Sequence, residues 1–197
     1  VPRITLSFSA ILILFRGNFA KPSCWSLCLA ENGDMDHLAA ISLGSNLSPR
    51  RETLALALEL LDEHRFVRVT AVSGYIETEP VLVGSDDDAV GPEDQPNYYN
   101  AAALIETTLA PQELLAVMQN IEGRLGRCRE TEIRFGPRTC DLDLILFDDC
   151  ILNTPILTLP HPRMAEREFV LRPLAEIAPK LRDPITGKTI AQLLKAL

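Results

Sequence analysis

The chain has 197 residues, enough to bury a sizeable core within a single domain. Its composition, 47% hydrophobic and 23% charged, is that of a globular protein and excludes a disordered or fibrous chain. The formal net charge of -8 argues against a broad nucleic-acid-binding surface, so any polyanionic ligand must bind at a local basic patch.

The first 36 residues differ from the rest of the chain. Residues 4–15 form an apolar run that is shorter than the roughly 20 residues a membrane-spanning helix needs, so we expect no membrane anchor. A signal peptide and an organellar transit peptide both fit the segment. We favour a third interpretation, in which translation starts at Met35 and the preceding stretch is an artefact or a floppy tail. We therefore expect an N-terminal extension over 1–36, disordered or a start-site artefact, and one domain over 37–197.

The five cysteines include no Cys-x-x-Cys pair and no zinc-ligand spacing. Free thiols in a reducing compartment are therefore expected, which favours the cytoplasm. Cys140 lies between arginines and aspartates and is a candidate nucleophile. In an extended strand, however, it shares a side with Leu142 and Leu144, which favours a small buried residue.

The domain opens with a strand, a helix and a second strand. Residues 37–43 form a short apolar run that predicts a buried strand ending in a turn. Asn46 or Ser48 is expected to cap a helix that extends to Glu63, with Pro49 in its first turn. Alternating apolar and polar residues then predict a second strand over 67–77.

The periodicity disappears between Thr78 and Asn97. A loop of this length inside a compact domain is most often a functional lid when it is not a disordered insertion. Its acidic stretch, 85–90, is compatible with a metal site, but the neighbouring small residues favour a solvated loop tip.

A strand over 98–106 and a helix that starts at Thr108 or Pro111 follow this loop. The end of the helix begins a segment in which five of the 19 basic residues lie within 15 positions. Guanidinium groups stay charged and repel one another, so such crowding favours a bound polyanion; ion pairs with Glu130 and Glu132 are the structural alternative. The five arginines are Arg124, Arg127, Arg129, Arg134 and Arg138.

The strand over 141–147 carries two aspartates on one face, about 6.6 Å apart along an extended chain. Asp141 and Asp143 repel each other unless a cation lies between them, and Mg²⁺ bound by carboxylates and substrate phosphates is the usual solution. The alternative is that the two aspartates only mark the solvent-exposed face of the strand and bind no metal. Beyond this strand, His161 between two prolines has a restricted backbone that suits a ligand-facing side chain.

The C-terminal part of the chain is predicted to be helical. Apolar residues over 163–178 have helical spacing, and Pro173 is expected to break this helix. A short closing helix is expected over 190–197.

Five separated motifs, in order over about residues 38–197, resemble 6-hydroxymethyl-7,8-dihydropterin pyrophosphokinase of folate synthesis. They are Leu43–Leu47, Glu77–Pro80, Asp94–Ala101, Gly136–Asp143 and Leu159–Met164. The resemblance implies a ferredoxin-like α+β fold in which helices back an antiparallel sheet and long mobile loops cover the active site. It also implies an ATP-dependent diphosphokinase that transfers the β- and γ-phosphates together to the pterin hydroxymethyl oxygen, leaving AMP.

The resemblance further assigns roles to individual positions. Asp141 and Asp143 match the ligands of two Mg²⁺ ions, and Arg127 and Arg138 match arginines that neutralise charge during transfer. The positions around ATP match Gln119, Glu122, Arg129, Thr158, His161 and Arg167. The positions around the pterin match Tyr98 and Phe169 as stacking partners, with Asn100, Thr78, Glu79 and Val81 near the edge of the ring. The implied partners are these two small molecules, without nucleic acid or membrane, and the oligomeric state stays open with a monomer as the working expectation.

The sequence departs from the family pattern at several points. Phe135 stands where family members often have Trp, and Pro162 stands where an aromatic residue often follows the histidine. The segment 129–134 is one residue longer, and 85–90 lengthens a loop over the pterin. No general base is evident; Asp143 is one candidate, and a metal-bound hydroxyl that needs none is the other. A nucleotidyl transferase and a ferredoxin-like ligand-binding module are the competing functional interpretations.

Overall fold

The structure, a computed structural model, describes residues 37–80, 95–128 and 136–197. All of them lie within one unit, Gly33–Leu197. The expectations for the N-terminal extension, the acidic stretch 85–90 and Phe135, and the candidate site residues Val81, Arg129 and Arg134, concern positions outside the described residues.

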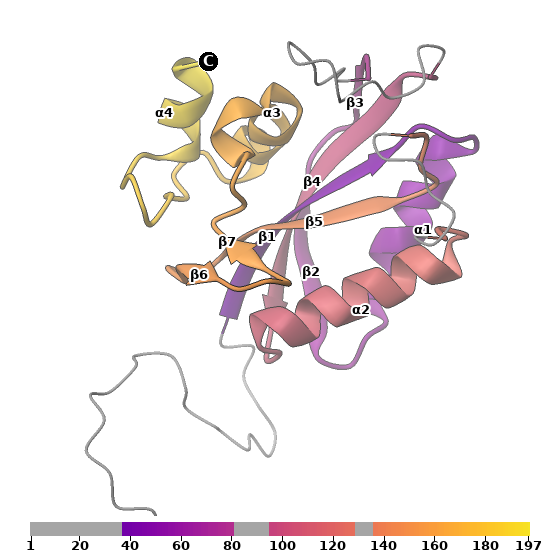
Figure 1. The fold of residues 1–197 in the computed structure, drawn as a ribbon, viewed down its shortest axis with the longest axis horizontal. Coiled ribbons are helices and arrows are strands. Elements are labelled where there is room, and N and C mark those ends of the chain that lie inside the picture. Colours follow the sequence, from indigo (N-terminus) through magenta and orange to yellow (C-terminus); the bar gives the residue numbers. More distant parts are fainter. Residues whose placement is uncertain (1–36, 81–94, 129–135) are drawn as a thin grey trace, which may run out of the picture. The chain divides into compact units, whose positions relative to one another are not determined.

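The core of the fold is an antiparallel sheet (Figure 1). Its strand order is β2-β4-β1-β5, and the three-residue strand β3 pairs with β4 as well. The short strands β6 (Leu152–Asn153) and β7 (Thr158–Leu159) pair antiparallel as a separate hairpin. The strands of the main sheet are β1 (His37–Ser45), β2 (Val67–Val72), β3 (Ile76–Thr78), β4 (Tyr98–Thr107) and β5 (Asp141–Phe147).

Helices cover both faces of this sheet. Successive side chains of a strand point to opposite faces, so Ile41 packs in one core cluster and its neighbour Ala40 in the other. The first cluster includes buried residues of α1 (Arg50–Asp62) and α2 (Pro111–Arg124), and the second includes residues of α3 (Glu168–Ile177) and α4 (Ile190–Lys195). The predicted α+β fold with helices on an antiparallel sheet is therefore confirmed.

The start of α1 differs from the expectation. Its N-cap is Pro49, and no side chain caps the helix. Asn46 is instead buried, and its Oδ1 accepts a hydrogen bond of 2.6 Å from the backbone N–H of Arg138. A distant part of the chain thus uses the capping capacity that the local sequence indicated.

The predicted single strand over 67–77 is divided into β2 and β3. Ser73 lies at the break, where its Oγ accepts a hydrogen bond from the backbone N–H of Ala102. The N–H of the adjacent Gly74 donates to Glu176 on α3. These bonds replace regular strand pairing and redirect the chain into β3.

Pro173 does not break the C-terminal helix, contrary to expectation. It lies inside α3, which is preceded by a short 3-10 turn, Met164–Glu166. Proline removes one helical hydrogen bond, but burial of Val170, Leu171 and Leu174 holds the helix on the sheet. The closing helix is present as α4. Within the described residues, no helix is both long and apolar enough to cross a membrane.

Candidate active site

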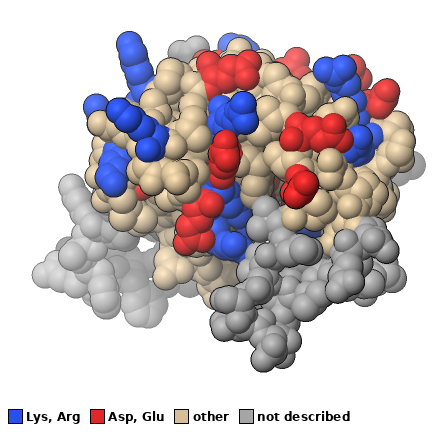
Figure 2. Space-filling view, turned by 90° about the horizontal axis from the view of Figure 1, so that it is seen from above, with Lys and Arg blue, Asp and Glu red and all other residues tan. Residues whose placement is uncertain are grey.

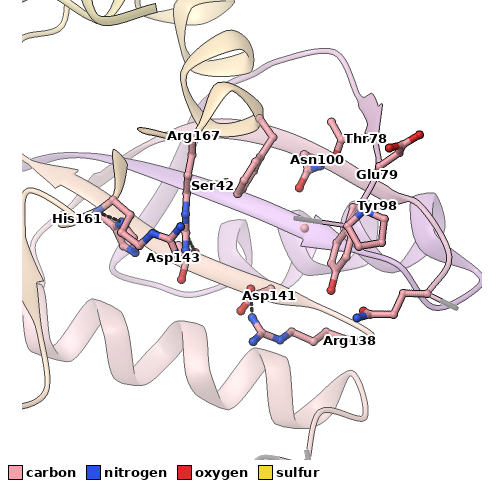
Figure 3. A pocket seen from close by; sticks show the side chains of 15 residues that line it. Ser42, Thr78, Glu79, Tyr98, Asn100, Arg138, Asp141, Asp143, His161 and Arg167 are labelled. Atoms are coloured by element: carbon pink, nitrogen blue, oxygen red, sulfur yellow. Dashed lines mark hydrogen bonds and ion pairs between the residues drawn. The ribbon is translucent and has the colours of Figure 1, made fainter. Parts of the chain in front are cut away.

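A cavity of about 210 Å³ lies on the side of the sheet that α3 covers (Figure 3). Its floor comes from β1, β4 and β5, and its walls come from β3 and the two residues after it, from the residues that lead into β4 and β5, and from the segment between β7 and the start of α3. The lining residues are Ser42, Gly44, Thr78, Glu79, Pro80, Gln95, Tyr98, Asn100, Arg138, Asp141, Asp143, His161, Arg163, Arg167 and Phe169.

The centre of the floor is formed by small residues of β1. Gly44 is paired with Asn100 of β4 on one side and with Asp141 of β5 on the other. A Cβ atom at position 44 would lie 3.2 Å from Asn100 Oδ1, which is closer than most Cβ contacts. Glycine therefore leaves room between a polar amide on one strand and a carboxylate on the next.

Two arginines bind the carboxylate of Asp141. Arg138 Nη1 donates to Asp141 Oδ2 at 2.6 Å, and Arg127 Nη1 donates to Oδ1. Burial on its own raises the pKa of Asp141, but the charges of Arg138 and Arg127 and their hydrogen bonds outweigh this and lower it. Asp141 is therefore ionised near neutral pH, and each of its oxygens faces a cation.

Asp143 is in a different electrostatic environment. Burial and the nearby charge of Asp141 raise its pKa to about 6, and Arg167 opposes this increase only in part. The separation of Arg167 Nη1 from Asp143 Oδ2 is 3.6 Å, a looser ion pair than those around Asp141. Two carboxylates that disfavour each other's ionisation in a cavity form a site that favours an additional cation.

Glu122 lies behind the cavity wall. Its side chain is 1% exposed, and its Oε1 accepts hydrogen bonds from Arg127 Nη1 at 2.6 Å and from the backbone N–H of Leu142 at 2.8 Å. Arg127 is 5% exposed. Glu122 thus connects α2, Arg127 and the start of β5, and it does not line the cavity.

Two hydrogen bonds to backbone groups hold His161, one through its own backbone N–H and one through its ring. Its N–H donates to the Ile145 carbonyl at 2.9 Å, and the Arg163 N–H donates to its Nδ1 at 3.2 Å. Because Nδ1 is the acceptor, the neutral ring carries its proton on Nε2. Burial, then the charges of Arg167 and Arg163, lower the pKa of His161 to about 4, so the ring is a neutral donor at physiological pH.

The other half of the cavity is aromatic and polar (Figure 3). Asn100 Nδ2 donates to Thr78 Oγ1 at 2.8 Å, which fixes the orientation of the amide. The hydroxyl of Tyr98 donates to the Gly136 carbonyl at 3.3 Å, and Phe169 lines the same cavity. The guanidinium of Arg167 lies 5.5 Å from the Phe169 ring centroid, between the two halves.

Asn46 connects Arg138 to the segment that leads into β4. Its Oδ1 accepts from the Arg138 N–H, while its Nδ2 donates to Gln95 Oε1 and to the Pro96 carbonyl, both at 3.3 Å. The sequence signalled this residue only as a helix cap, although it belongs to the motif Leu43–Leu47. Its function as a bridge depends on contacts with residues 49 to 92 positions away, which no local pattern reveals.

The structure brings most of the candidate residues together. Those that line the cavity are Thr78, Glu79, Tyr98, Asn100, Arg138, Asp141, Asp143, His161, Arg167 and Phe169. Arg127 and Glu122 contact the site through Asp141 and Leu142, whereas Gln119 on α2 and Thr158 on β7 do not line the cavity. The residues that sequence reasoning missed are Ser42, Gly44, Asn46, Gln95 and Arg163.

Cys140 is not a nucleophile in this site. Its side chain is fully buried, as predicted, and burial followed by the charges of Glu122 and Asp141 raises the pKa of the thiol to about 12. A buried, protonated thiol is unreactive, so Cys140 packs in the core beside β5.

The donor set suits a hard divalent cation bound together with phosphate. Among the described residues, no three His, Cys, Asp or Glu side chains come together as a metal cage. The two aspartates are oxygen ligands, and Mg²⁺ is usually bound by one or two carboxylates, water and substrate phosphates. Arginines on the same wall match the charge of a polyphosphate, and the aromatic half suits a flat heterocycle.

Solved structures with a similar fold include an HPPK-DHPS in complex with substrates, with a TM-score of 0.59 and 13% identity. Plasmodium falciparum HPPK-DHPS, wild type with pteroate, has a TM-score of 0.60 and 16% identity. The aligned region covers 81% of this chain in both cases, but only 43% and 44% of those longer chains. At this identity the similarity supports the fold alone.

The sequence matches the family model of 7,8-dihydro-6-hydroxymethylpterin-pyrophosphokinase (HPPK) over residues 40–179. The 2-amino-4-hydroxy-6-hydroxymethyldihydropteridine pyrophosphokinase of Bacillus subtilis (strain 168) is 47% identical, with 78% of this chain and 85% of that protein covered. The protein of the same name from Pseudomonas aeruginosa is 42% identical, with 79% and 89% covered. The chain therefore belongs to the 7,8-dihydro-6-hydroxymethylpterin-pyrophosphokinase family.

Proposed function

We propose that this chain transfers the β,γ-pyrophosphoryl group of ATP to the hydroxymethyl oxygen of 6-hydroxymethyl-7,8-dihydropterin, giving the pterin diphosphate and AMP in folate biosynthesis. The observation that carries the proposal is the division of one cavity into two chemically different halves. Arginines and carboxylates line one half, and Tyr98, Asn100 and Phe169 line the other. A triphosphate and a flat acceptor can therefore meet within the same small volume.

The cationic half binds the triphosphate. Phosphoryl transfer needs little covalent help from the protein, so positioning and preorganised positive charge supply most of the catalysis. Arg138 and Arg127 are already fixed on Asp141, and Arg167 faces the cavity beside Asp143. These arginines neutralise charge during transfer, while His161 donates a hydrogen bond from Nε2 to a phosphate oxygen.

Asp141 and Asp143 are the proposed ligands of two Mg²⁺ ions. When bound, Mg²⁺ would supply positive charge that stabilises the negative charge developing on the phosphate oxygens. The chain itself orients both carboxylates from one face of β5 and anchors Asp141 from two sides. The ligands are thus positioned before the substrates arrive.

The aromatic half binds the pterin. Tyr98 and Phe169 stack on the two faces of the ring, and the amide of Asn100 pairs with its edge as both donor and acceptor. Thr78 orients that amide, and Glu79 adds an acceptor from the next residue of the same wall. The remaining proposed positions are Val81 for the pterin and Gln119, Arg129 and Thr158 for ATP.

The proposed partners are these two small molecules, and a monomer acting in the cytoplasm is sufficient for the reaction. Figure 2 shows acidic and basic side chains interspersed over the visible described part of one face, which matches the acidic net charge. A polyanion such as nucleic acid finds no extended basic surface there.

The reaction products distinguish this activity from nucleotidyl transfer. The protein, ATP, Mg²⁺ and 6-hydroxymethyl-7,8-dihydropterin are incubated together, and the products are separated by anion-exchange chromatography. AMP and the pterin diphosphate are expected in equal amounts, with neither formed when the pterin is left out. Release of inorganic pyrophosphate with a nucleotide-modified pterin would instead indicate a nucleotidyl transferase, and folded protein that yields neither product would contradict the proposal.

Replacing Gly44 with Ala should weaken pterin binding. The added methyl carbon would lie 3.2 Å from Asn100 Oδ1 in the floor of the cavity, so the amide has to shift by a few tenths of an ångström. We expect the KM for the pterin to rise roughly tenfold, which corresponds to the loss of about one good hydrogen bond, while the KM for ATP changes less than about twofold. Gly123, where an added Cβ meets nothing within 4 Å, provides the matched Gly→Ala control. An equal rise in both KM values would show that position 44 does not act on the pterin half.

A further inference from the structure

The side chain of Arg50 joins three separate segments behind the cavity. It starts from the first turn of α1, and its Nη1 donates to Glu77 Oε1 of β3 at 2.9 Å and to the carbonyl of Asn97 just before β4. Its guanidinium carbon lies 4.3 Å from the centroid of the Tyr99 ring on β4. One guanidinium thus contacts the helix side of both strands that carry the pterin half.

These contacts lie on the face of the sheet opposite to the cavity. Glu77 and Tyr99 are register partners, and the next pair along the ladder is Thr78 with Tyr98. Because side chains alternate, Thr78 and Tyr98 point into the cavity while Glu77 and Tyr99 point toward α1. Arg50 therefore cannot touch a ligand in the cavity, but it supports the two strands whose other face does.

The strand β3 needs such support. It has three residues, pairs only with β4 among the described strands, and leads directly to the lining residues Glu79 and Pro80. An ion pair with Glu77, which is 45% exposed, contributes little by itself. The bond to the Asn97 carbonyl and the stacking on Tyr99 add a second and a third contact, and the arginine side chain is 24% exposed.

We infer that Arg50 is a positioning residue for the pterin half of the site. It holds β3 on β4 so that Thr78 stays within hydrogen-bond distance of Asn100, and it leaves the triphosphate half untouched. The inference rests on the proposed function for the identity of the ligand. It adds a residue of α1, outside the cavity, to the set that determines acceptor affinity.

The test uses Arg50→Met, which keeps an unbranched apolar stem over Tyr99 but removes the charge and all donors. We expect the KM for the pterin, and its Kd measured by fluorescence with a nonhydrolysable ATP analogue, to rise about tenfold. The KM for ATP and kcat should stay within about twofold. Arg50→Lys restores one ion pair without the forked geometry and should give an intermediate pterin KM.

Arg68→Met is the matched control, because Arg68 pairs with Glu106 across the same sheet at 3.4 Å and is far from the cavity lining. It should leave both KM values within about twofold. An unchanged pterin KM in Arg50→Met, or an equal loss for ATP and pterin, would overturn the inference. If Arg50→Met fails to fold, Glu77→Gln takes its place with an expected pterin KM about threefold higher, and an unchanged value would equally overturn it.

Hydrogen–deuterium exchange separates this inference from the proposed function, because it needs no substrate. Amides of residues 76–78 should exchange at least about fivefold faster in Arg50→Met than in the wild type, with the amides of β1 and β5 unchanged. Unchanged exchange in β3 would show that Arg50 does not hold the strand. If Arg50→Met shows this faster exchange but the wild-type protein releases no AMP, the proposed activity is contradicted while the support of β3 by Arg50 stands.

Discussion

Replacing Asp141 with Asn should lower the turnover number at least about a hundredfold while the protein remains folded. The amide removes one negative oxygen from the site where divalent charge and substrate phosphates are proposed to meet, and such electrostatic contributions are among the largest in catalysis. Arg138 and Arg127 then face a neutral group. AMP release at saturating substrates measures the effect, and a Mg²⁺ titration should show that much more metal is needed.

Asp149→Asn is the matched control for this change, because Asp149 is exposed in the turn at the opposite end of β5. Its turnover should equal that of the wild type within about twofold. Circular dichroism should show that Asp141→Asn remains folded, with a lower unfolding midpoint because Arg138 and Arg127 lose a charged partner. Undiminished AMP release by the Asn variant would refute the assignment of Asp141 as a metal ligand.

Replacing Glu122 with Ala should destabilise the fold by about 3 kcal/mol, the lower end of the range for breaking a buried ion pair. The side chain is 1% exposed and accepts hydrogen bonds from Arg127 and from the Leu142 N–H. Its removal leaves a buried guanidinium with less compensation and a buried amide without this acceptor. Equilibrium unfolding in urea measures the loss, and activity should fall as well because Arg127 loses one of the two carboxylates that hold it.

Glu59→Ala on α1 is the control, because Glu59 is an exposed glutamate inside a helix. Its free energy of unfolding should stay within about 0.5 kcal/mol of the wild type. The double variant Glu122→Ala with Arg127→Ala should lose clearly less than the sum of the single variants if the two residues interact directly. Strict additivity would show that Glu122 stabilises the fold independently of Arg127.

The strands and helices with strong periodicity were predictable from the sequence. The apolar run at 37–43 reflects burial on both faces of β1, whereas the alternation in β2 and the helical spacing of Leu114 and Met118 reflect burial on one face. The wrong predictions were those in which a distant group competes with a local rule. Asn46 binds Arg138 instead of capping α1, and Pro173 is tolerated because the helix around it is packed on the sheet.

The candidate site was accessible from the sequence through motifs, but its physical organisation was not. The family resemblance selected Asp141, Tyr98 and Phe169 as members of one site, and all three line the cavity. It could not show that Glu122 lies behind Arg127, because that depends on how α2 packs beside β5. The importance of Gly44 also depends on its two register partners, and single-residue patterns carry no information about register.

The row formed by Asn100, Gly44 and Asp141 has a consequence for how the two substrates are aligned. The amide of Asn100, which we propose binds the pterin, stands on β4, and the carboxylate of Asp141, a proposed metal ligand, stands on β5, with β1 between them. Two strand spacings of about 4.8 Å place the backbones of these strands roughly 9.6 Å apart. Main-chain hydrogen bonds maintain that spacing, so the distance between β4 and β5 does not depend on which side chains they carry. Substitutions in either half can therefore tune affinity while the distance between the reacting groups is conserved by the backbone itself.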